Sequence, residues 1–418
     1  MYLMDSSSMI VSEADPNLFS GSGHSIINLG DAVQVVLMLS PHGRGSFPEQ
    51  AQQALSAVDA VLTKLPQTMT ITLLTVFLRN PCDRVNCEQI LADYFGSKLP
   101  VINFVIQPPC CGSALSLEAW GIGGNSVQVE YRSSQALAVS YDDTIRSIYC
   151  AGIKPADSVR GVYAQTVDAL QRMDEVLNQA GSRFEHVVRT WLYLEGITEN
   201  EEDKQRYKEL NRARADYYNN IRFCSSLVKN DIVDKVYPSS TCIGTAETGL
   251  LLSCLTLETQ REDVFLVQLE NPAQTPAYDY PPIVSFQSPK FSRAMALVIG
   301  DYITTWISGT ASIVNFESLH LDDIEKQTQQ TIDNIERLIS PENFASHGVK
   351  GAGASLHDLA QVRVYLKRPH DFAGCKAVCE RRFGSVPIIY SIADVCRPEL
   401  LVEIEGAAFS RYWRTPKS

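Results

Sequence analysis

The chain has 418 residues, of which 45% are hydrophobic and 20% charged, enough for the cores of roughly two or three domains. Its formal net charge of −12 argues against a general nucleic-acid or anionic-membrane binder, because such proteins need basic surfaces. An anionic small substrate is still compatible, since it needs only a local arginine cluster. The sequence has no apolar run near the roughly 18 residues that cross a bilayer, so we expect no membrane association.

The eleven cysteines are odd in number and scattered, which indicates reduced thiols and a cytoplasmic protein. Cys375 and Cys379 share a helical face without a second ligand pair, so we expect no metal site. No haem or flavin motif is present, and we expect no cofactor. Residues 1–24 lack the basic and apolar regions of a signal peptide, and we expect a flexible tail there.

Beyond this tail, one pattern occurs three times: hairpin-like material, an amphipathic helix, a strand, a second helix and a pair of strands. In the first third these elements are expected at 32–39, 49–65, 70–78, 87–95, 101–107 and 114–120. In the second third they are expected at 126–150, 162–180, 187–194, 201–219, 237–245 and 250–257. In the last third they are expected at 294–309, 324–339, 359–367, 371–383, 388–394 and 400–408.

The strand that follows the first helix aligns among the three thirds, at 75–78, 191–194 and 363–366. We therefore predict an α+β fold of three β-β-α-β-α-β-β units rather than three unrelated pieces. The units are residues 25–125 (degenerate), 126–275 and 276–418. Three such units can close their sheet faces around a pseudo-threefold axis, with pockets between them. This resembles the Rid (YjgF) family, normally a homotrimer of one unit, so a fused pseudo-trimer is expected to be a monomer.

Several stretches carry a narrower resemblance: RTWLY at 189–193, RY and NRAR within 206–214, YPSSTCIGT at 237–245, ENP and AYDYP within 270–281, SPKFSRA at 288–294 and ISGTASI at 307–313. Together they resemble the chorismatases, over about residues 120–410. One motif departs: where that family usually reads Gly-His-Glu-Ser-x-His, this chain has Asn315-Phe316-Glu317-Ser318-Leu319-His320. Glu317 is kept, but the departure leaves the exact substrate or product open.

The resemblance implies cofactor-free cleavage of the enol ether of chorismate. The products would be pyruvate and a hydroxybenzoate, with 3-hydroxybenzoate favoured, or a dihydroxycyclohexadiene carboxylate. This chemistry needs a carboxyl group that stays protonated near neutral pH and delivers its proton to the terminal methylene carbon. Glu403 is the candidate acid, and the resemblance places the family's catalytic glutamate in the same strand.

The pattern of the 400–408 strand does not decide whether this carboxyl is buried or exposed to solvent. Leu401, Glu403 and Glu405 share one strand face, which either meets water or lines a polar pocket. In the third repeat, the sequence pattern puts Glu403 in this strand. The matching part of the second repeat reads LLSC and has no glutamate. The first repeat has Glu118 nearby, but its register in the strand is uncertain. We therefore predict one active site per chain, between the second and third units.

Arginines bind carboxylates through paired hydrogen bonds, and chorismate has two carboxylates. The candidates for substrate binding are Arg206, Arg214, Arg293 and Arg397, with Tyr207, Tyr237 and Glu317. A surface ion pair is the alternative for any of these arginines.

The resemblance also implies a role for Cys396, because Cys396 lies seven residues before Glu403. In chorismatases this position is Cys in the branch that forms 3-hydroxybenzoate and tends to be Ala in the branch that hydrolyses chorismate. It is the candidate product-determining residue; the alternative is a small buried side chain.

Two other functions are compatible with the sequence. One is a Rid-type enamine/imine deaminase, in which an arginine holds the substrate carboxylate and a glutamate places water. The other is a non-catalytic ligand-binding or scaffold protein built on an inactive Rid trimer. The altered Asn315-Phe316 motif and the additional first unit favour these alternatives.

Overall fold

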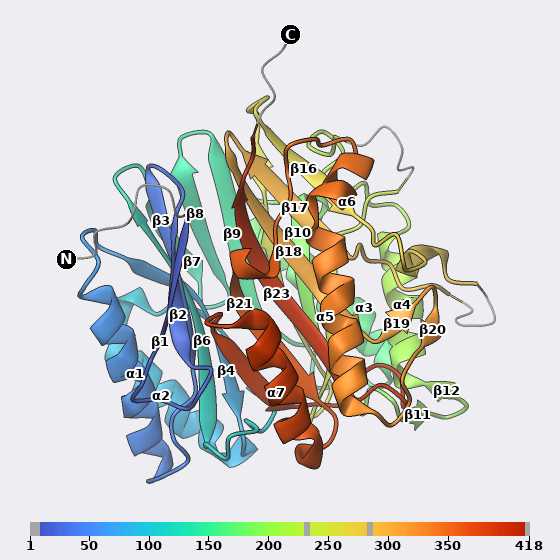
Figure 1. Ribbon diagram of the computed structural model, residues 1–418, viewed down its shortest axis with the longest axis horizontal. Helices are drawn as coiled ribbons and strands as arrows, with labels where there is room; N and C mark the ends of the chain where they lie inside the picture. Colours follow the sequence, from blue (N-terminus) through green and yellow to red (C-terminus); the bar gives the residue numbers. More distant parts are fainter. Residues whose placement is uncertain (1–8, 230–234, 282–286, 414–418) are drawn as a thin grey trace.

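The computed structural model describes residues 9–229, 235–281 and 287–413. Its strands form three large sheets at the centre of the molecule, and helices cover the outer face of each sheet (Figure 1). This arrangement confirms the α+β class.

The first sheet contains β1 (Ile10–Ala14), β2 (Gly23–Asn28), β3 (Ala32–Leu39), β4 (Thr70–Leu78), β5 (Val101–Ile106) and β6 (Leu115–Gly124), and its helices are α1 (Phe47–Leu62) and α2 (Arg84–Phe95). The second contains β7 (Gln128–Ser133), β8 (Ala136–Asp142), β9 (Ile145–Ile153), β10 (Val187–Glu195), β13 (Ser239–Thr245), β14 (Leu250–Thr256) and β15 (Glu258–Thr259), and its helices are α3 (Val162–Gln179) and α4 (Arg206–Tyr218). The third contains β16 (Val264–Leu269), β17 (Ala294–Ile299), β18 (Tyr302–Ala311), β21 (Leu359–Leu366), β22 (Ile388–Ile392) and β23 (Val402–Arg411), and its helices are α5 (Ile324–Ile339), α6 (Pro341–Ser346) and α7 (Phe372–Phe383). Two small hairpins add β11 (Asn200–Glu201) with β12 (Lys204–Gln205), and β19 (Ile313–Val314) with β20 (Glu317–Ser318).

The three sheets share one topology. Their strand orders are β1-β2-β3-β6-β4-β5, β7-β8-β9-β14-β10-β13 and β16-β17-β18-β23-β21-β22. In each order the last pair is parallel and the other neighbours are antiparallel. Each sheet therefore begins with three successive strands, one more than the predicted unit.

The additional strands correct two predicted boundaries. The flexible tail predicted over residues 1–24 is wrong for β1, which pairs with β2 from Ile10↔Ile27 to Ala14↔Gly23; residues 1–8 lie outside the described residues. The third sheet begins at Val264 rather than at residue 276, because β16 pairs with β17. Both are edge strands, whose place depends on the neighbour they pair with more than on their composition. The helix predicted from residue 201 begins at Arg206, because the preceding residues form the β11–β12 hairpin.

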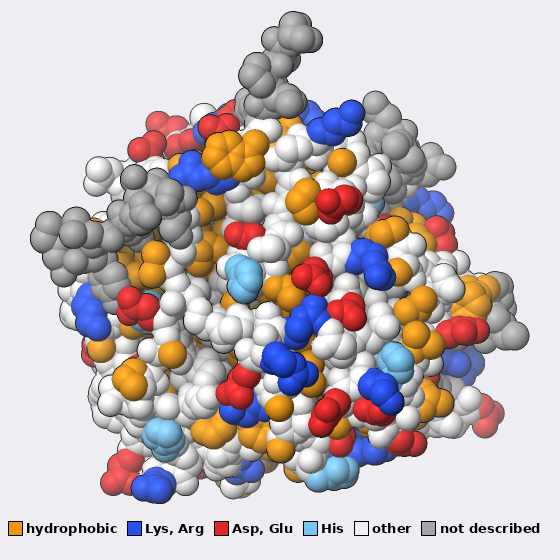
Figure 2. Space-filling model, in the orientation of Figure 1, with side chains coloured by type: hydrophobic (Ala, Val, Ile, Leu, Met, Phe, Trp, Pro, Cys, Tyr) orange, Lys and Arg blue, Asp and Glu red, His pale blue; other side chains and the backbone are white. Residues whose placement is uncertain are grey.

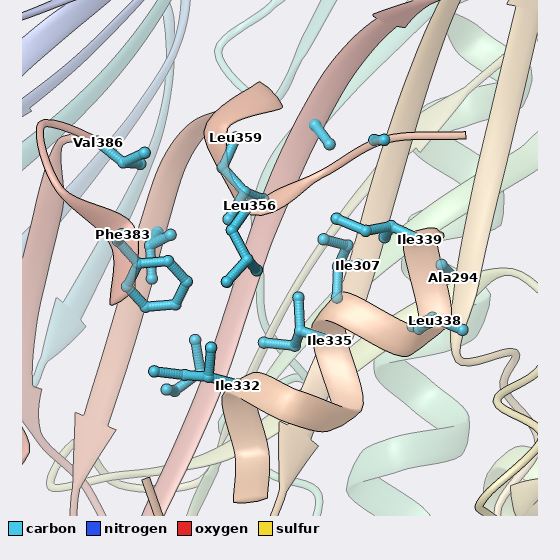
Figure 3. Packing of buried hydrophobic residues seen from close by; sticks show 14 of the residues in the cluster. Ala294, Ile307, Ile332, Ile335, Leu338, Ile339, Leu356, Leu359, Phe383 and Val386 are labelled. Atoms are coloured by element: carbon cyan, nitrogen blue, oxygen red, sulfur yellow. The ribbon is translucent and has the colours of Figure 1, made fainter. Parts of the chain in front are cut away.

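Each sheet buries one face under its helices. In the third sheet, Ile332, Ile335 and Ile339 of α5 project from one helix face at the spacing that the sequence predicts. They pack with Leu359 of β21 and Phe383 of α7 (Figure 3). Burying each such side chain stabilises the fold by about 1.5–3 kcal/mol.

The opposite faces of the three sheets pack against one another. Phe77 of β4, Tyr193 of β10 and Tyr365 of β21 belong to one buried cluster, although each comes from a different sheet. They occupy equivalent places in the three stretches that align in the sequence. The inner faces therefore meet at the centre of the molecule.

Buried charges join the sheets at this centre. Arg363 of β21 forms ion pairs with Glu118 of β6 and with Glu405 of β23, where Nη1 lies 3.1 Å from Oε1. Arg189 of β10 pairs with the other oxygen of Glu405. Arg363 also donates to the hydroxyl of Tyr193 at 3.0 Å. These charged side chains are at most 2% exposed, and all three sheets contribute to the network.

On the face shown in Figure 2, acidic and basic side chains are interspersed. Among the described helices, none combines the length and apolar character that a membrane crossing requires.

We expect Glu118→Ala to lower the free energy of unfolding by about 3 kcal/mol, because it leaves the buried Arg363 guanidinium incompletely paired. Urea unfolding followed by tryptophan fluorescence measures the loss. Glu130→Ala is the matched control, since Glu130 is exposed and pairs with Arg132 on the surface, and its effect should stay within about 0.5 kcal/mol. Equal effects of the two substitutions would contradict the structural role of the network.

Candidate active site

A cavity opens between the second and third sheets. It encloses about 790 Å³ of empty space, including its opening to solvent. One wall comes from α4 and β13, and the other from β18, β23 and the segment before β23. The lining residues are Gln205, Tyr207, Lys208, Arg214, Ser240, Cys242, Tyr280, Pro289, Phe291, Arg293, Gly309, Ala311, Ile313, Cys396, Arg397 and Glu403.

The carboxyl group of Glu403 lies beside a break in the neighbouring strand. The pairing of β18 with β23 shifts register between Ile307 and Thr310, which is a β-bulge. Gly309 lies in this bulge, and a Cβ atom there would be 1.9 Å from Oε1 of Glu403. A glycine at this position therefore leaves the room that the carboxyl occupies.

The surroundings of Glu403 favour its protonated form. Burial raises its pKa to about 8, and the nearby charge of Glu405 acts in the same direction, against the opposing effect of Arg293 and Arg189. The side chain is only 4% exposed. At neutral pH the Glu403 carboxyl therefore holds a proton that it can deliver.

Glu405, two residues further along the same strand face, has the opposite character. Burial alone would raise its pKa, but Arg363 and Arg189, with hydrogen bonds from Thr241 and Tyr365, hold that pKa below its usual value. The hydroxyl of Thr241 donates to Oε2 at 2.6 Å. One strand thus presents a charged carboxylate and a neutral carboxyl side by side.

Three arginines of the cavity lining form no side-chain ion pair with a carboxylate in the described part of the chain: Arg214, Arg293 and Arg397. Glu270 lies near Arg293, but its Oε1 accepts from the backbone N–H of Arg293 at 3.3 Å. Arg293 donates to the Tyr280 hydroxyl at 2.6 Å, and Arg214 donates to Oδ1 of Asn211 at 2.6 Å. The Nε atoms of both are buried without a partner. Arg397 donates to neutral oxygen atoms. Because a buried guanidinium without an anion is costly, this arrangement is suited to an anionic ligand.

The structure brings six of the predicted site residues to this cavity: Glu403, Cys396, Arg293, Arg214, Tyr207 and Arg397. The predicted location between the second and third units agrees with this placement.

Three predicted site residues lie elsewhere. Arg206 turns away from its neighbour on the helix and pairs with Glu195, where Nη2 lies 3.6 Å from Oε2. Tyr237 precedes β13 and packs against Tyr278, with ring centres 5.5 Å apart. Glu317 is exposed in the β19–β20 hairpin. Each belongs to a stretch that carries the resemblance, but the stretch alone does not show which side chains face the cavity.

Several further lining residues on the same elements were not predicted from the sequence. They include Ser240 and Cys242 on β13, and Gly309, Ala311 and Ile313 on or just after β18. Both sets alternate along a strand, so a period of two within these stretches is the signal that identifies them.

The sheet register shows which residues stand in the place of Glu403 in the other sheets. Glu403 is opposite Tyr365, Ser116 is opposite Phe77, and Leu251 is opposite Tyr193. By the same register, Glu118 corresponds to Glu405, because their partners are Thr75 and Arg363. The equivalent places in the first and second sheets therefore have no carboxyl.

Cys396 lines the cavity as a neutral thiol. Burial raises its pKa to about 12, and Glu403, which is ionised in that pH range, acts in the same direction. It therefore does not provide a thiolate near neutral pH. Elsewhere, Cys375 and Cys379 have sulfur atoms 3.9 Å apart, but no cluster of three or more potential metal ligands occurs in the described ranges.

The raised pKa of Glu403 gives a test that needs no activity. The folded state binds this proton more tightly than the unfolded chain, so the stabilisation is complete below the ordinary glutamate pKa and is lost as the pH rises through about 8. We expect the unfolding free energy of the unmodified protein to fall relative to that of Glu403→Gln by up to about 1.4 kcal/mol per pH unit over this window. Urea unfolding from pH 5 to pH 9 measures the difference, and parallel pH profiles would contradict it.

Comparisons with known proteins find relatives in sequence and in fold. The family model "Chorismatase FkbO/Hyg5-like, N-terminal" matches residues 118–256. A chorismatase crystal structure aligns with 81% of this chain and 93% of its own, with a TM-score of 0.59 and 21% identity, which shows a shared fold. A RutC family protein of Pyrococcus abyssi is 34% identical over 89 residues, which cover 21% of this chain and 62% of that protein.

The curated relatives include proteins of Streptomyces. The chorismatase of Streptomyces rapamycinicus is 31% identical over 226 residues, which cover 53% of this chain and 63% of the relative. The 3-hydroxybenzoate synthase of Streptomyces hygroscopicus is 32% identical over 277 residues, which cover 64% of this chain and 75% of the relative. With this coverage, and with the same fold, the chain belongs to the chorismatase family.

Proposed function

We propose that this enzyme cleaves the enol ether of chorismate in the cavity between the second and third sheets and releases pyruvate and 3-hydroxybenzoate. The names of its relatives support this reaction, since they include chorismatases and a 3-hydroxybenzoate synthase. The observation that carries the proposal is a buried carboxyl of raised pKa, Glu403, in a cavity whose arginines lack carboxylate partners.

The substrate would bind through its charge. Chorismate carries two carboxylates, and Arg214, Arg293 and Arg397 offer guanidinium groups that form no side-chain ion pair among the described residues. A guanidinium binds a carboxylate through two parallel hydrogen bonds, which also fixes its orientation. Tyr207, on the same wall as Arg214, is available to hydrogen-bond a ring hydroxyl or a carboxylate.

Glu403 would act as the general acid. Its proton adds to the terminal methylene carbon, which becomes a methyl group, while the electron pair of the carbon–carbon double bond forms the new C–H bond. The adjacent carbon becomes positively charged, and the ether oxygen shares this charge. The resulting Glu403 carboxylate stabilises the cation electrostatically. Because Glu405 is already ionised, the proton comes from Glu403.

The product depends on which oxygen captures this cation. Capture by water consumes one water and gives pyruvate and a dihydroxycyclohexadiene carboxylate. Pyruvate and 3-hydroxybenzoate together have the atoms of chorismate alone, so this route consumes no net water. Capture by the substrate's own hydroxyl meets this balance: it forms a cyclic ketal, the ring C–O bond of that hydroxyl oxygen then breaks, and a ring proton leaves to the Glu403 carboxylate as the ring becomes aromatic. The hydroxyl oxygen departs as the carbonyl oxygen of pyruvate, and the ether oxygen stays on the ring as the phenol. Cys396 places a neutral thiol in the cavity, and its role would be to favour internal capture over attack by water.

We propose in addition that the three sheets are the cores of three fused Rid-like units arranged as a pseudo-trimer. Their shared strand order supports this, as does the packing of their inner faces within one chain. The units would extend over about residues 9–125, 126–260 and 261–413, close to the predicted division. Because one chain supplies all three units, we propose a monomer.

A Rid-type enamine/imine deaminase is the second candidate, favoured by the similarity to the RutC family protein. Such a substrate has one carboxylate and needs one arginine, whereas this cavity presents three.

A direct assay separates the chorismatase from the deaminase: incubation with chorismate, followed by measurement of pyruvate and identification of the aromatic product. Hydrolysis of 2-aminoacrylate without release of pyruvate from chorismate would overturn the proposal in favour of the deaminase. Neither activity, with ligand binding retained, would indicate a binding protein.

We expect Glu403→Gln to lower kcat for pyruvate release about a hundredfold or more, because an amide at this position cannot protonate the methylene carbon. Pyruvate coupled to lactate dehydrogenase measures the rate, and circular dichroism verifies the fold. Glu130→Gln, on the exposed strand β7, is the matched control and should retain full activity. Retention of activity in Glu403→Gln would exclude Glu403 as the acid.

We expect Cys396→Ala to shift the product from 3-hydroxybenzoate toward the dihydroxycyclohexadiene carboxylate while pyruvate release continues. Chromatography of the reaction mixture gives the product ratio. Cys82→Ala, which changes an exposed cysteine, should leave the ratio as it is. An unchanged ratio in Cys396→Ala would remove Cys396 from the control of product.

A further inference from the structure

A second cavity lies where the inner faces of all three sheets meet, and we propose that it binds a small uncharged aromatic molecule that carries a hydroxyl group. This site is distinct from the cavity of Glu403 and does not depend on the proposed reaction. It encloses about 670 Å³ of empty space, including its opening to solvent.

Aromatic rings from every sheet form its walls. Trp120 comes from β6 of the first sheet, Tyr149 and Trp191 from β9 and β10 of the second, and Trp306 from β18 of the third. The three indole rings are only partly buried, so their remaining exposed surface faces the cavity or its opening. Indole and phenol faces pack well with a flat aromatic ring in offset or edge-to-face contact. The walls therefore favour a planar ligand.

Two polar groups in the lining have no hydrogen-bond partner in the described part of the chain. They are Nη1 of Arg189, a donor, and Oε1 of Gln361, an acceptor, and both atoms are buried. The two side chains are 1% and 6% exposed. A buried polar atom without a partner is costly, so native structures usually pair such atoms. A hydroxyl group can accept a hydrogen bond from such a donor or donate one to such an acceptor, so a ligand hydroxyl is suited to either group.

The charges of the lining favour an uncharged ligand. Glu405 and Arg189 both line the cavity, and they already neutralise each other as an ion pair. A carboxylate ligand would be repelled by Glu405, and an ammonium ligand by Arg189. The cavity of Glu403 has the opposite character, because its three arginines lack carboxylate partners. The two cavities should therefore select ligands by charge.

Fluorine NMR with 4-fluorophenol and 4-fluorobenzoate as probes tests this proposal on the full chain. We expect saturable binding of 4-fluorophenol and at least about tenfold weaker binding of 4-fluorobenzoate at this site. Absence of saturable 4-fluorophenol binding, or equal affinity for the two probes, would overturn the proposal.

Variants identify the site that the probe occupies. Thr304→Trp enlarges a half-buried side chain of the cavity wall and should abolish 4-fluorophenol binding. Gln361→Leu should weaken 4-fluorophenol about tenfold, yet leave 4-fluorotoluene, which has no hydroxyl, unchanged. This comparison holds even if Thr304→Trp does not fold. Glu403→Gln should leave 4-fluorophenol binding intact, and a loss there would place the probe in the first cavity and overturn the proposal.

Discussion

Two carboxyl groups project from the same face of one buried strand, and the two nearby buried arginines neutralise only one of them. Glu405 forms ion pairs with Arg189 of the second sheet and with Arg363 of the third sheet, to which Glu405 also belongs. Glu403 forms no ion pair with an arginine among the described residues, and it lies beside the charged carboxylate of Glu405. The cost of two adjacent charges in an interior of low dielectric then assigns the proton to Glu403. The reactivity of the site thus follows from the pairing of its neighbour.

The same network also holds the fold together. Arg363 binds Glu118 of the first sheet as well as Glu405, so the contacts that join the sheets also keep Glu405 ionised. Buried ion pairs add little net stability, but the loss of one partner is expensive. Substitutions in the network should therefore change both stability and the pKa of Glu403, even though Glu118 lies outside the cavity lining.

The backbone of β18 also shapes the site, through the β-bulge beside Glu403. The bulge in β18 brings Gly309 against the Glu403 carboxyl and turns Ser308 toward the second sheet, where its hydroxyl accepts from the backbone N–H of Ser240 at 2.8 Å. Any side chain at position 309 would overlap this carboxyl. Bulges occur often beside active sites, because they redirect a strand without ending it.

Much of the secondary structure could be predicted from local patterns. The strand at 70–78 and the helix at 324–339 have the predicted bounds, because long runs with a clear period leave little ambiguity. The edge strands β1 and β16 were missed, since a short strand is defined by its neighbour. The motif resemblance pointed to Glu403 and to all three arginines of the cavity lining, but it did not separate Tyr207, which lines the cavity, from the adjacent Arg206, which does not.

By itself the sequence determined the order of elements, their threefold recurrence and the face of β23 that carries both glutamates. Only the tertiary structure decided what that face meets. The decisive pairs join residues far apart in the chain: Arg363 is 245 residues from Glu118, and Arg189 is 216 residues from Glu405. Periodicity shows which side chains share a face, but it has no information about which faces come together. That depends on how three sheets with the same topology pack their inner faces, and this packing leaves Glu403 protonated.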